Sequence, residues 1–240
     1  MVNDRILTLL NEIAILFPVF LLIFAVKGFV QAFVAKFMGD KTAQEYGFLT
    51  LNPLAHIDLL GLIVVLIVYF VVGTIFTEPL PSNTFFIILV TFGARMIIPI
   101  PMDDHNFKHR TLGGICTALS GAMGNFLLAI GCILSIKTLL FFHIPKYALI
   151  SLIGILTKTI DLCVLFGILN LIPIPPFDNG QILHYILPTS KQNIITWLEE
   201  YSFIIFLIIF FVPGISDSFF AILSLLSMAV KKILFSILIS

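Results

Sequence analysis

The chain has 240 residues, of which 60% are hydrophobic and only 11% are charged, and its mean hydropathy is +1.15. Soluble domains are about half apolar and a quarter charged, so this composition excludes a soluble globular protein. The formal net charge is zero and no basic stripe is present, which argues against nucleic acid as a partner. We expect an all-α polytopic membrane protein, with about six helices of ~20 residues in a single domain covering residues 1–240.

The first apolar segment, residues 6–38, predicts a membrane-spanning helix. It is too long for a cleavable signal peptide and has no small-residue cleavage site before a polar region, so we expect a retained span. Pro18 predicts a kink in this helix, and Gly39 followed by Asp40 predicts its end.

Lys27 lies deep inside this segment, and Gln31 shares its helix face one turn later. A lysine inside a bilayer costs several kcal/mol unless it finds an anion or extends its side chain to the interface. Lys27 is far from both ends of the helix, which favours an anionic partner.

A polar turn at residues 52–58 precedes a second predicted span at residues 59–76. His56 and Asp58 in this turn are either metal ligands or a hydrogen-bonded histidine beside a helix-capping aspartate. Capping is favoured, because side chains two residues apart do not face each other on a helix. A short third apolar segment follows at residues 84–90.

Prolines keep the next segment, residues 99–108, out of a helix. It contains Asp103, Asp104 and His105, which are residue types that bind metals. Consecutive side chains point in different directions, so a solvated loop is favoured over a metal site.

The fourth predicted span, residues 112–140, begins with small residues that permit close helix packing: Gly113, Gly114, Gly121 and Gly124. Asn125 lies among them and makes either a helix–helix hydrogen bond or a substrate contact. The cysteines, Cys116, Cys132 and Cys163, fall in apolar segments without ligand-like pairing, so we expect buried free thiols.

The fifth predicted span, residues 147–171, carries Lys158 and Asp161 three residues apart, where they can pair on one helix face. After Pro188 we expect an interfacial stretch that contains Trp197, Glu199 and Glu200. The last apolar region is predicted to break at Pro213 and Gly214 into two short helices, with Lys231 and Lys232 as interface anchors. Lys and Arg are nearly balanced between alternate loops, so their distribution does not orient the chain.

Residues 170–180, Asn-Leu-Ile-Pro-Ile-Pro-Pro-Phe-Asp-Asn-Gly, interrupt the apolar sequence with three prolines and Asp178. Non-helical backbone at membrane depth survives only when it is buried in protein or lines a cavity, and intramembrane carboxylates are usually functional. Asp178 is therefore a site candidate. A loop at the headgroups with a solvated Asp178 is an alternative of about equal weight.

Together, several segments resemble the site-2 protease family of intramembrane zinc metalloproteases, in particular its small six-span bacterial group. They occur in the same order and spacing along most of the chain. The segments are residues 34–43, residues 49–58 (Leu-Thr-Leu-Asn-Pro-Leu-Ala-His-Ile-Asp), Pro99 and Pro101 with residues 106–108, Gly121 with Asn125, and residues 170–178.

The resemblance implies a His-Glu-x-x-His motif on the first span, whose histidines hold zinc and whose glutamate acts as general base. It also implies that the aspartate of the Pro-rich motif, here Asp178, is the third protein ligand. Three ligands leave a fourth position for an activated water. In this chain the histidine positions are Lys27 and Gln31, and the glutamate position is Gly28.

We therefore expect a pseudoenzyme in a bacterial cell membrane, with no zinc, in which Lys27 replaces the metal's charge and pairs with Asp178. The resemblance assigns the binding of transmembrane segments of client proteins to Asn125, Pro99, Pro101 and Asn170, with membrane lipid as the other partner. One alternative is an active zinc protease that uses Asp178 with a loop histidine such as His56 or His105. Another is a small transporter or channel whose broken helices line a pathway.

Overall fold

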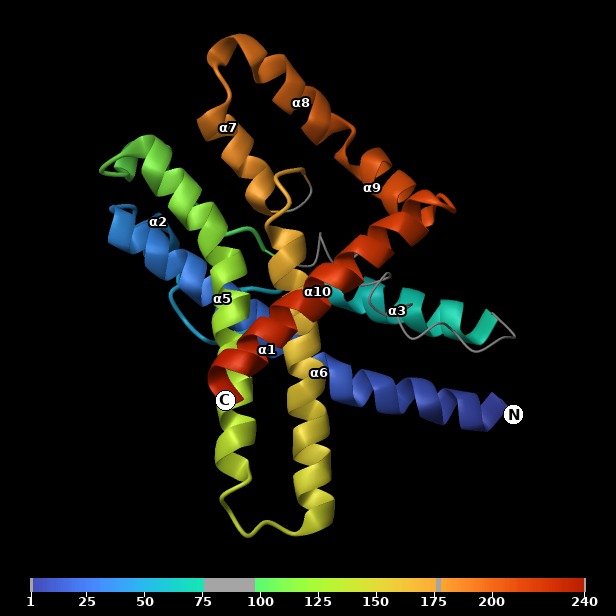
Figure 1. Cartoon of the computed structure of the whole chain (residues 1–240). Helices are drawn as coiled ribbons and strands as arrows, with labels where there is room; N and C mark the ends of the chain where they lie inside the picture. Colours follow the sequence, from blue (N-terminus) through green and yellow to red (C-terminus); the bar gives the residue numbers. More distant parts are fainter. Residues whose placement is uncertain (1, 76–97, 176–177, 240) are drawn as a thin grey trace.

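Helices make up all the regular structure in the part of the chain that the computed structural model describes, residues 2–75, 98–175 and 178–239 (Figure 1). Within these ranges four helices are long and apolar enough to cross a membrane: residues Leu10–Met38 of α1 (Val2–Met38), α5 (Arg110–Leu139), α6 (Lys146–Asn170), and residues Ile215–Leu238 of α10 (Ile215–Ile239). This confirms the predicted all-α polytopic membrane protein. The predicted apolar segment at residues 84–90 lies outside the described residues.

Shorter elements connect these helices. After α1 come α2 (Thr42–Glu45), the 3-10 turn η1 (Pro53–Ala55) and α3 (Leu59–Ile75), and the turn η2 (Asp104–Asn106) precedes α5. Beyond α6 the chain forms η3 (Asp178–Gln181), α7 (Ile182–Ile186), η4 (Thr189–Lys191), α8 (Gln192–Glu200) and α9 (Ser202–Phe211).

Helix α1 ends where the sequence predicts. The N–H of Gly39 donates to the carbonyl of Lys36 at 3.1 Å, and the N–H of Asp40 donates to the carbonyl of Ala35 at 3.0 Å. Gly39 has φ +117°, the left-handed conformation that glycine adopts most readily. The pair of bonds is a Schellman motif, which satisfies carbonyls that the helix end leaves open. Pro18 lies inside α1, and its effect on the helix axis stays a prediction.

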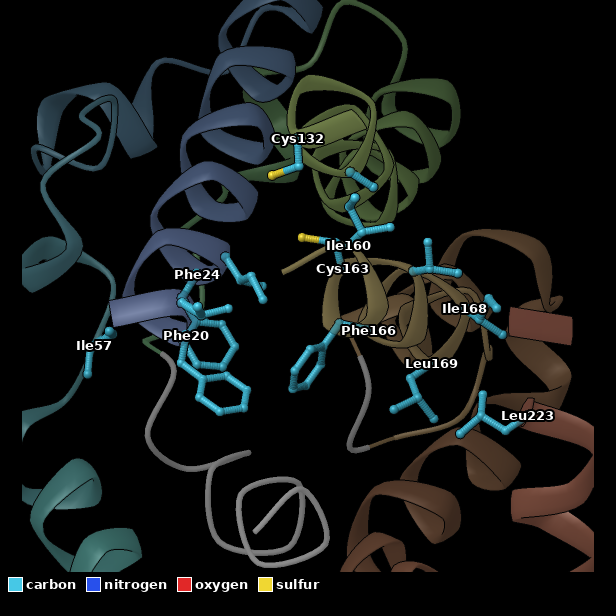
Figure 2. Close-up of a cluster of buried hydrophobic side chains, with 14 of the residues drawn as sticks. Phe20, Phe24, Ile57, Cys132, Ile160, Cys163, Phe166, Ile168, Leu169 and Leu223 are labelled. Atoms are coloured by element: carbon cyan, nitrogen blue, oxygen red, sulfur yellow. The ribbon is translucent and has the colours of Figure 1, made fainter. Parts of the chain in front are cut away.

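The core forms where α1 packs against the antiparallel pair α5 and α6 (Figure 1). Phe20 and Phe24 of α1 face Phe166 of α6, with ring centroids 5.8 Å apart in both pairs and edge-on geometry (Figure 2). Such aromatic pairs add about 0.5–1.5 kcal/mol each beyond the burial of their area. Cys132 and Cys163 are buried free thiols in this core, as predicted, whereas the free thiol Cys116 is only partly buried, so the prediction of burial is wrong for that residue.

The glycines of α5 have two different functions. A Cβ on Gly124 would lie 3.2 Å from the Cα of Lys27, so glycine there permits the close approach of α1 and α5, as predicted. A Cβ on Gly113 would lie 2.5 Å from the Phe107 ring, and one on Gly114 would lie 2.1 Å from the Tyr185 ring. Gly113 therefore leaves space for the ring of Phe107 in the loop before α5, and Gly114 leaves space for the ring of Tyr185 in α7.

Helix α10 lies across α5 and α6 (Figure 1). The chain breaks before it at Gly214, which has φ +84°, but the helix has 25 residues, so the prediction of two short helices is wrong for the second one. Nζ of Lys231 donates to Oδ1 of Asp161 at 2.6 Å. This corrects two predictions: Asp161 pairs with α10 rather than with Lys158, and Lys231 is an interhelical partner rather than an interface anchor.

Candidate functional site

The positions to which the resemblance assigns the first metal motif lie on a buried face of α1. The side chains of Lys27 and Gln31 are 4% and 6% exposed, and both pack beside Gly121 of α5. A Cβ on Gly121 would lie 3.4 Å from Cε of Lys27 and 3.5 Å from Cδ of Gln31. The sequence prediction of a buried lysine with glutamine on the same face is thus confirmed.

The third position of the motif, Gly28, is covered by the imidazole ring of His56. A Cβ on Gly28 would lie 2.2 Å from Nδ1 of His56, closer than real Cβ contacts allow. A glutamate at position 28 therefore requires His56 to leave its place. Because 28 residues separate the two in the chain, no local pattern in the sequence indicates this contact.

His56 lies in a turn outside the spanning helices, where its side chain makes one hydrogen bond to the described residues. Its Nε2 lies 2.9 Å from the carbonyl oxygen of Thr50, which can only accept, so Nε2 carries the proton and the neutral ring has its lone pair on Nδ1. Burial lowers the pKa of His56 and the Lys27 charge lowers it further, against the opposing effect of the Thr50 bond. His56 is therefore neutral near pH 7. Nδ1 has no hydrogen-bond partner within the described ranges.

Asp58 caps α3, as predicted. Its carboxylate oxygens accept the N–H groups of Leu60 at 3.2 Å and Gly61 at 3.1 Å. The ring of His56 bonds to the carbonyl of Thr50, whereas Asp58 bonds to the start of α3, so the two side chains have different partners and are not paired as metal ligands here.

A cavity of about 20 Å³ lies between these side chains and the loop before α5. Its walls include Lys27, Gln31, His56, Pro99 and Gln181, completed by Phe24, Gly28, Ile98, Ile100 and Met102. This volume has room for about one water molecule. The 99–108 loop thus borders the candidate site as the resemblance implies, through Pro99, whereas Pro101 is not among the cavity's walls.

Asp40 positions this loop. Its buried carboxylate accepts the N–H of Asp103 at 2.9 Å and the side-chain amide of Asn106 at 3.3 Å, in addition to the N–H of Thr42 at 3.0 Å. Burial alone would raise the pKa of Asp40, but these hydrogen bonds and that of the Thr42 hydroxyl outweigh it and lower the pKa below 3.8. The sequence predicts Asp40 only as part of the end of the first helix. Its role in holding the loop could have been suspected from its position, directly after the helix-ending Gly39 and two residues before Thr42.

Asn125 is fully buried on α5, one helical turn after Gly121. Both atoms of its amide lack a hydrogen-bond partner among the residues that the structure describes, and the same is true of Asn179 in η3. Buried polar groups without partners are rare in folded proteins. The hydrogen-bonding groups of these two amides are thus not used by the described residues. Asn170, the last residue of α6, is also buried.

The acidic residues of the 99–108 loop bond to protein groups nearby or face solvent. Asp103 accepts the N–H of His105 at 3.0 Å and so caps η2, whereas Asp104 accepts the hydroxyl of Tyr185 and contacts Arg110. The His105 side chain is exposed. The solvated loop that the sequence favoured is thus confirmed.

The Pro-rich motif folds tightly, since a Cβ on Gly180 would lie 2.7 Å from the backbone nitrogen of Pro175. The side chain of Asp178 lies outside the described residues, so its predicted pairing with Lys27 stays a prediction. Across the described side chains, no three His, Cys, Asp or Glu residues come together in a group that can hold a metal ion.

The chain is similar to a curated protein of Bacillus subtilis (strain 168) named "Putative zinc metalloprotease YwhC". The two are 29% identical over 193 residues, which cover 79% of this chain and 77% of that protein. No protein-family model matches the chain, and no solved structure matches it significantly. Fold and similarity together describe a metalloprotease-like integral membrane protein.

Proposed function

We propose that the chain is a member of the site-2 protease family, in a bacterial cell membrane, that no longer cleaves peptide bonds. Its function is to bind transmembrane segments of client proteins beside α1. The observation that carries the proposal is the chemistry of one buried helix face, where Lys27 and Gln31 are buried and Gly28 faces the ring of His56. These are the positions to which the resemblance assigns two zinc-binding histidines and a glutamate base.

The side chains on this face do not fit a catalytic zinc ion. A lysine ammonium has three N–H donors and no lone pair, and a glutamine amide is a neutral group outside the usual zinc ligands. His56 offers one ring nitrogen, so His56 and Asp178 together supply at most two of the three protein ligands that catalytic zinc requires. The loss of a general base alone lowers a rate by roughly 10²–10⁴-fold.

The parts of the site that would hold a peptide remain. Pro99 and its apolar neighbours border the small cavity, and the buried amide of Asn125 has both a donor and an acceptor to offer. A transmembrane segment that unwinds beside α1 exposes backbone groups that need such partners. We assign client binding to Asn125, Pro99, Pro101 and Asn170.

We also assign Asp178 as the anionic partner of Lys27. A buried ammonium beside a carboxylate would supply the charge balance that a metal provides in active relatives. The resemblance brings these two positions together around one metal, and the burial of Lys27 requires its charge to be compensated.

Metal analysis combined with a restored motif tests the loss of catalysis. We expect the purified protein to hold far less than one zinc per chain and to leave synthetic transmembrane peptides uncleaved. The variant Lys27→His, Gly28→Glu, Gln31→His should gain zinc, and adding His56→Ala should increase the gain because it removes the ring that blocks position 28. Near one zinc per chain with chelator-sensitive cleavage in the unaltered protein would overturn the proposal.

Photocrosslinking tests client binding separately. A photoreactive amino acid at Met102, beside the cavity, should crosslink to an added transmembrane peptide, whereas the same group at the exposed Leu134 of α5 should not. Equal crosslinking from both positions would mean that the peptide has no preference for this site.

An active zinc protease with an unusual ligand set is the second candidate. Two observations favour it: the name of the Bacillus subtilis relative, and the position of the His56 Nδ1 lone pair beside the same cavity. The zinc measurement above separates the two candidates.

A further inference from the structure

A second, larger cavity of about 530 Å³ lies between the start of α5 and the helices α7 and α8. Small-molecule sites typically enclose about 300–1,000 Å³. Every described residue that lines the cavity is polar or charged, including Asp104, Arg110, Gln181, His184, Gln192 and Glu199. Gln181 also borders the first cavity, and the proposed function assigns no role to any of these side chains.

Two ion pairs border this cavity, one from each side. Nη2 of Arg110, at the start of α5, lies 3.3 Å from Oδ2 of Asp104. Nε2 of His184 in α7 lies 2.8 Å from Oε1 of Glu199 in α8. Neither pair uses all of its hydrogen-bonding atoms within the described residues. Arg110 makes one contact with these residues and so has further guanidinium N–H donors, and Oε2 of Glu199 accepts no hydrogen bond from the described residues.

Tyr185 fixes the position of α7 beside this cavity. Its ring packs against Gly114 of α5, and its hydroxyl donates to Oδ1 of Asp104. Burial raises the pKa of Tyr185, and the bond to Asp104 raises it further, so the hydroxyl keeps its proton at physiological pH. The helices around the cavity are therefore packed together, while the side chains of Arg110 and Glu199 at its border are 66% and 50% exposed.

Arg110 is the first residue of α5, a helix long and apolar enough to cross a membrane, so the cavity adjoins the end of a candidate span, where the boundary between hydrocarbon and water is expected. Trp197 of α8 and Tyr201, which follows that helix, have exposed rings with centroids 5.2 Å apart, and tryptophan and tyrosine concentrate at this boundary.

We propose that this cavity binds the phosphoethanolamine headgroup of a membrane phospholipid. The guanidinium of Arg110 binds the phosphate, for which its planar set of donors is suited. Oε2 of Glu199 accepts an N–H of the primary ammonium. A ligand that carries both charges matches a cavity in which Arg110 has further N–H donors beside its partner Asp104 and Glu199 has a second carboxylate oxygen beside its partner His184. A choline headgroup has no N–H to donate, and an anionic glycerol headgroup has no cation for Glu199. The proposal is independent of whether the chain cleaves peptides.

Native mass spectrometry of the full chain tests the proposal. The delipidated protein is offered equal amounts of phosphatidylethanolamine, phosphatidylcholine and phosphatidylglycerol with the same acyl chains. We expect the ethanolamine lipid to be retained most, and Arg110→Gln and Glu199→Gln each to weaken its retention by roughly tenfold, as expected for the loss of one charge-assisted contact. Soluble phosphoethanolamine should compete only weakly, because it lacks the acyl chains that the bilayer face of the protein contacts.

Two exposed charges nearby provide matched controls. Glu200→Gln and Lys191→Gln remove charges of the same region that do not line the cavity, and they should leave lipid retention unchanged. Equal retention of the three lipids, or equal damage from Glu199→Gln and Glu200→Gln, would overturn the proposal. Retention of phosphatidylglycerol that depends on Arg110 alone would show a plain anion site instead.

Crosslinking in native membranes separates a lipid from a peptide as the occupant. A photoreactive group at Gln192, which lines the cavity, should react with phospholipid. A reaction with protein in place of lipid would mean that the cavity binds a polypeptide, and the proposal would be wrong.

Discussion

The contact between Gly28 and His56 makes a sharp prediction at the scale of single residues. Gly28→Ala forces a methyl group against the buried imidazole and should lower the free energy of unfolding by about 1–3 kcal/mol, the usual cost of overpacking. His56→Ala is itself costly, because it removes a buried, hydrogen-bonded ring, but in that background the obstacle is gone and adding Gly28→Ala should cost little more. Thermal or denaturant unfolding in detergent measures both values.

Gly131 and Gly154 are suitable controls, because open space surrounds the position of a Cβ at both. Alanine there should be neutral or stabilise the helix by up to about 1 kcal/mol. If Gly28→Ala behaves like these two variants, His56 does not pack against Gly28.

The buried Lys27 allows a second test at this scale. The proposed pairing of Lys27 with a buried anion predicts that Lys27→Ala costs roughly 3–5 kcal/mol of unfolding free energy, because the anion is left uncompensated. If that anion is Asp178, the double variant Lys27→Leu, Asp178→Leu should recover most of the stability, because two apolar residues can replace a buried pair at little cost. Equal damage from the single and double variants would exclude the pair.

At this scale the sequence predicts burial better than contacts. Lys27 stands out because it interrupts a long apolar segment, and the capping function of Asp58 follows from its place just before a helix. The contacts of His56 with Gly28 and of Asp40 with Asp103 join residues far apart in the chain. They depend on how the helices pack, which periodicity and spacing do not encode.

At the scale of elements, Asp40 joins the end of α1 to the loop before α5. Hydrogen bonds lower its folded pKa below the ordinary value of 3.8, so its contribution to stability is fully present above that value and is lost as the pH falls through the folded pKa. We expect Asp40→Ala to lose about 1–3 kcal/mol of unfolding free energy at pH 7. The difference from the unaltered protein should shrink below pH 3.8, as unfolding curves recorded against pH would show. A constant difference would contradict the assigned role.

The ion pair between α6 and α10 is a second element-scale test. Lys231→Leu leaves Asp161 without its partner inside the bilayer and should cost up to about 3 kcal/mol of unfolding free energy. Adding Asp161→Leu should recover most of this. Lys232→Leu, in the neighbouring exposed position, is the matched control and should change little. If Lys158→Leu proved as costly as Lys231→Leu, the lysine within α6 would also be a partner of Asp161.

The sequence predicts where helices end, but not which helices form ion pairs with each other. Gly39 and the prolines of the 99–108 loop place helix boundaries through local backbone geometry. From the sequence, Asp161 could pair with either of two lysines, Lys158 on its own helix or Lys231 on α10. The packing of α10 across α6 decides between them, and no local signal reports it.

At the scale of the whole molecule, the structure places the turn between α5 and α6 and the helices α7 and α8 at opposite ends of α5 (Figure 1). A helix of 30 residues is about 45 Å long, enough to cross a bilayer. In a variant with all three cysteines replaced by alanine, new cysteines at His143 and Glu200 should therefore lie on opposite sides of the membrane. An impermeant maleimide applied to sealed vesicles should label only one of them, and labelling of both from the same side would contradict this topology.

The pairing of Lys231 with Asp161 also has a consequence for biosynthesis. A lone charged residue near the middle of a helix opposes its transfer from the translocon into lipid by about 2.5–3.5 kcal/mol. The α6 segment leaves the ribosome before α10, which supplies the partner of Asp161 in the folded protein, so until then only Lys158 of the same helix is near enough to pair with this acid. We therefore expect α6 to become stably inserted in the membrane only after α10 has emerged from the ribosome. The last helix would then assist the insertion of α6, which is synthesised earlier.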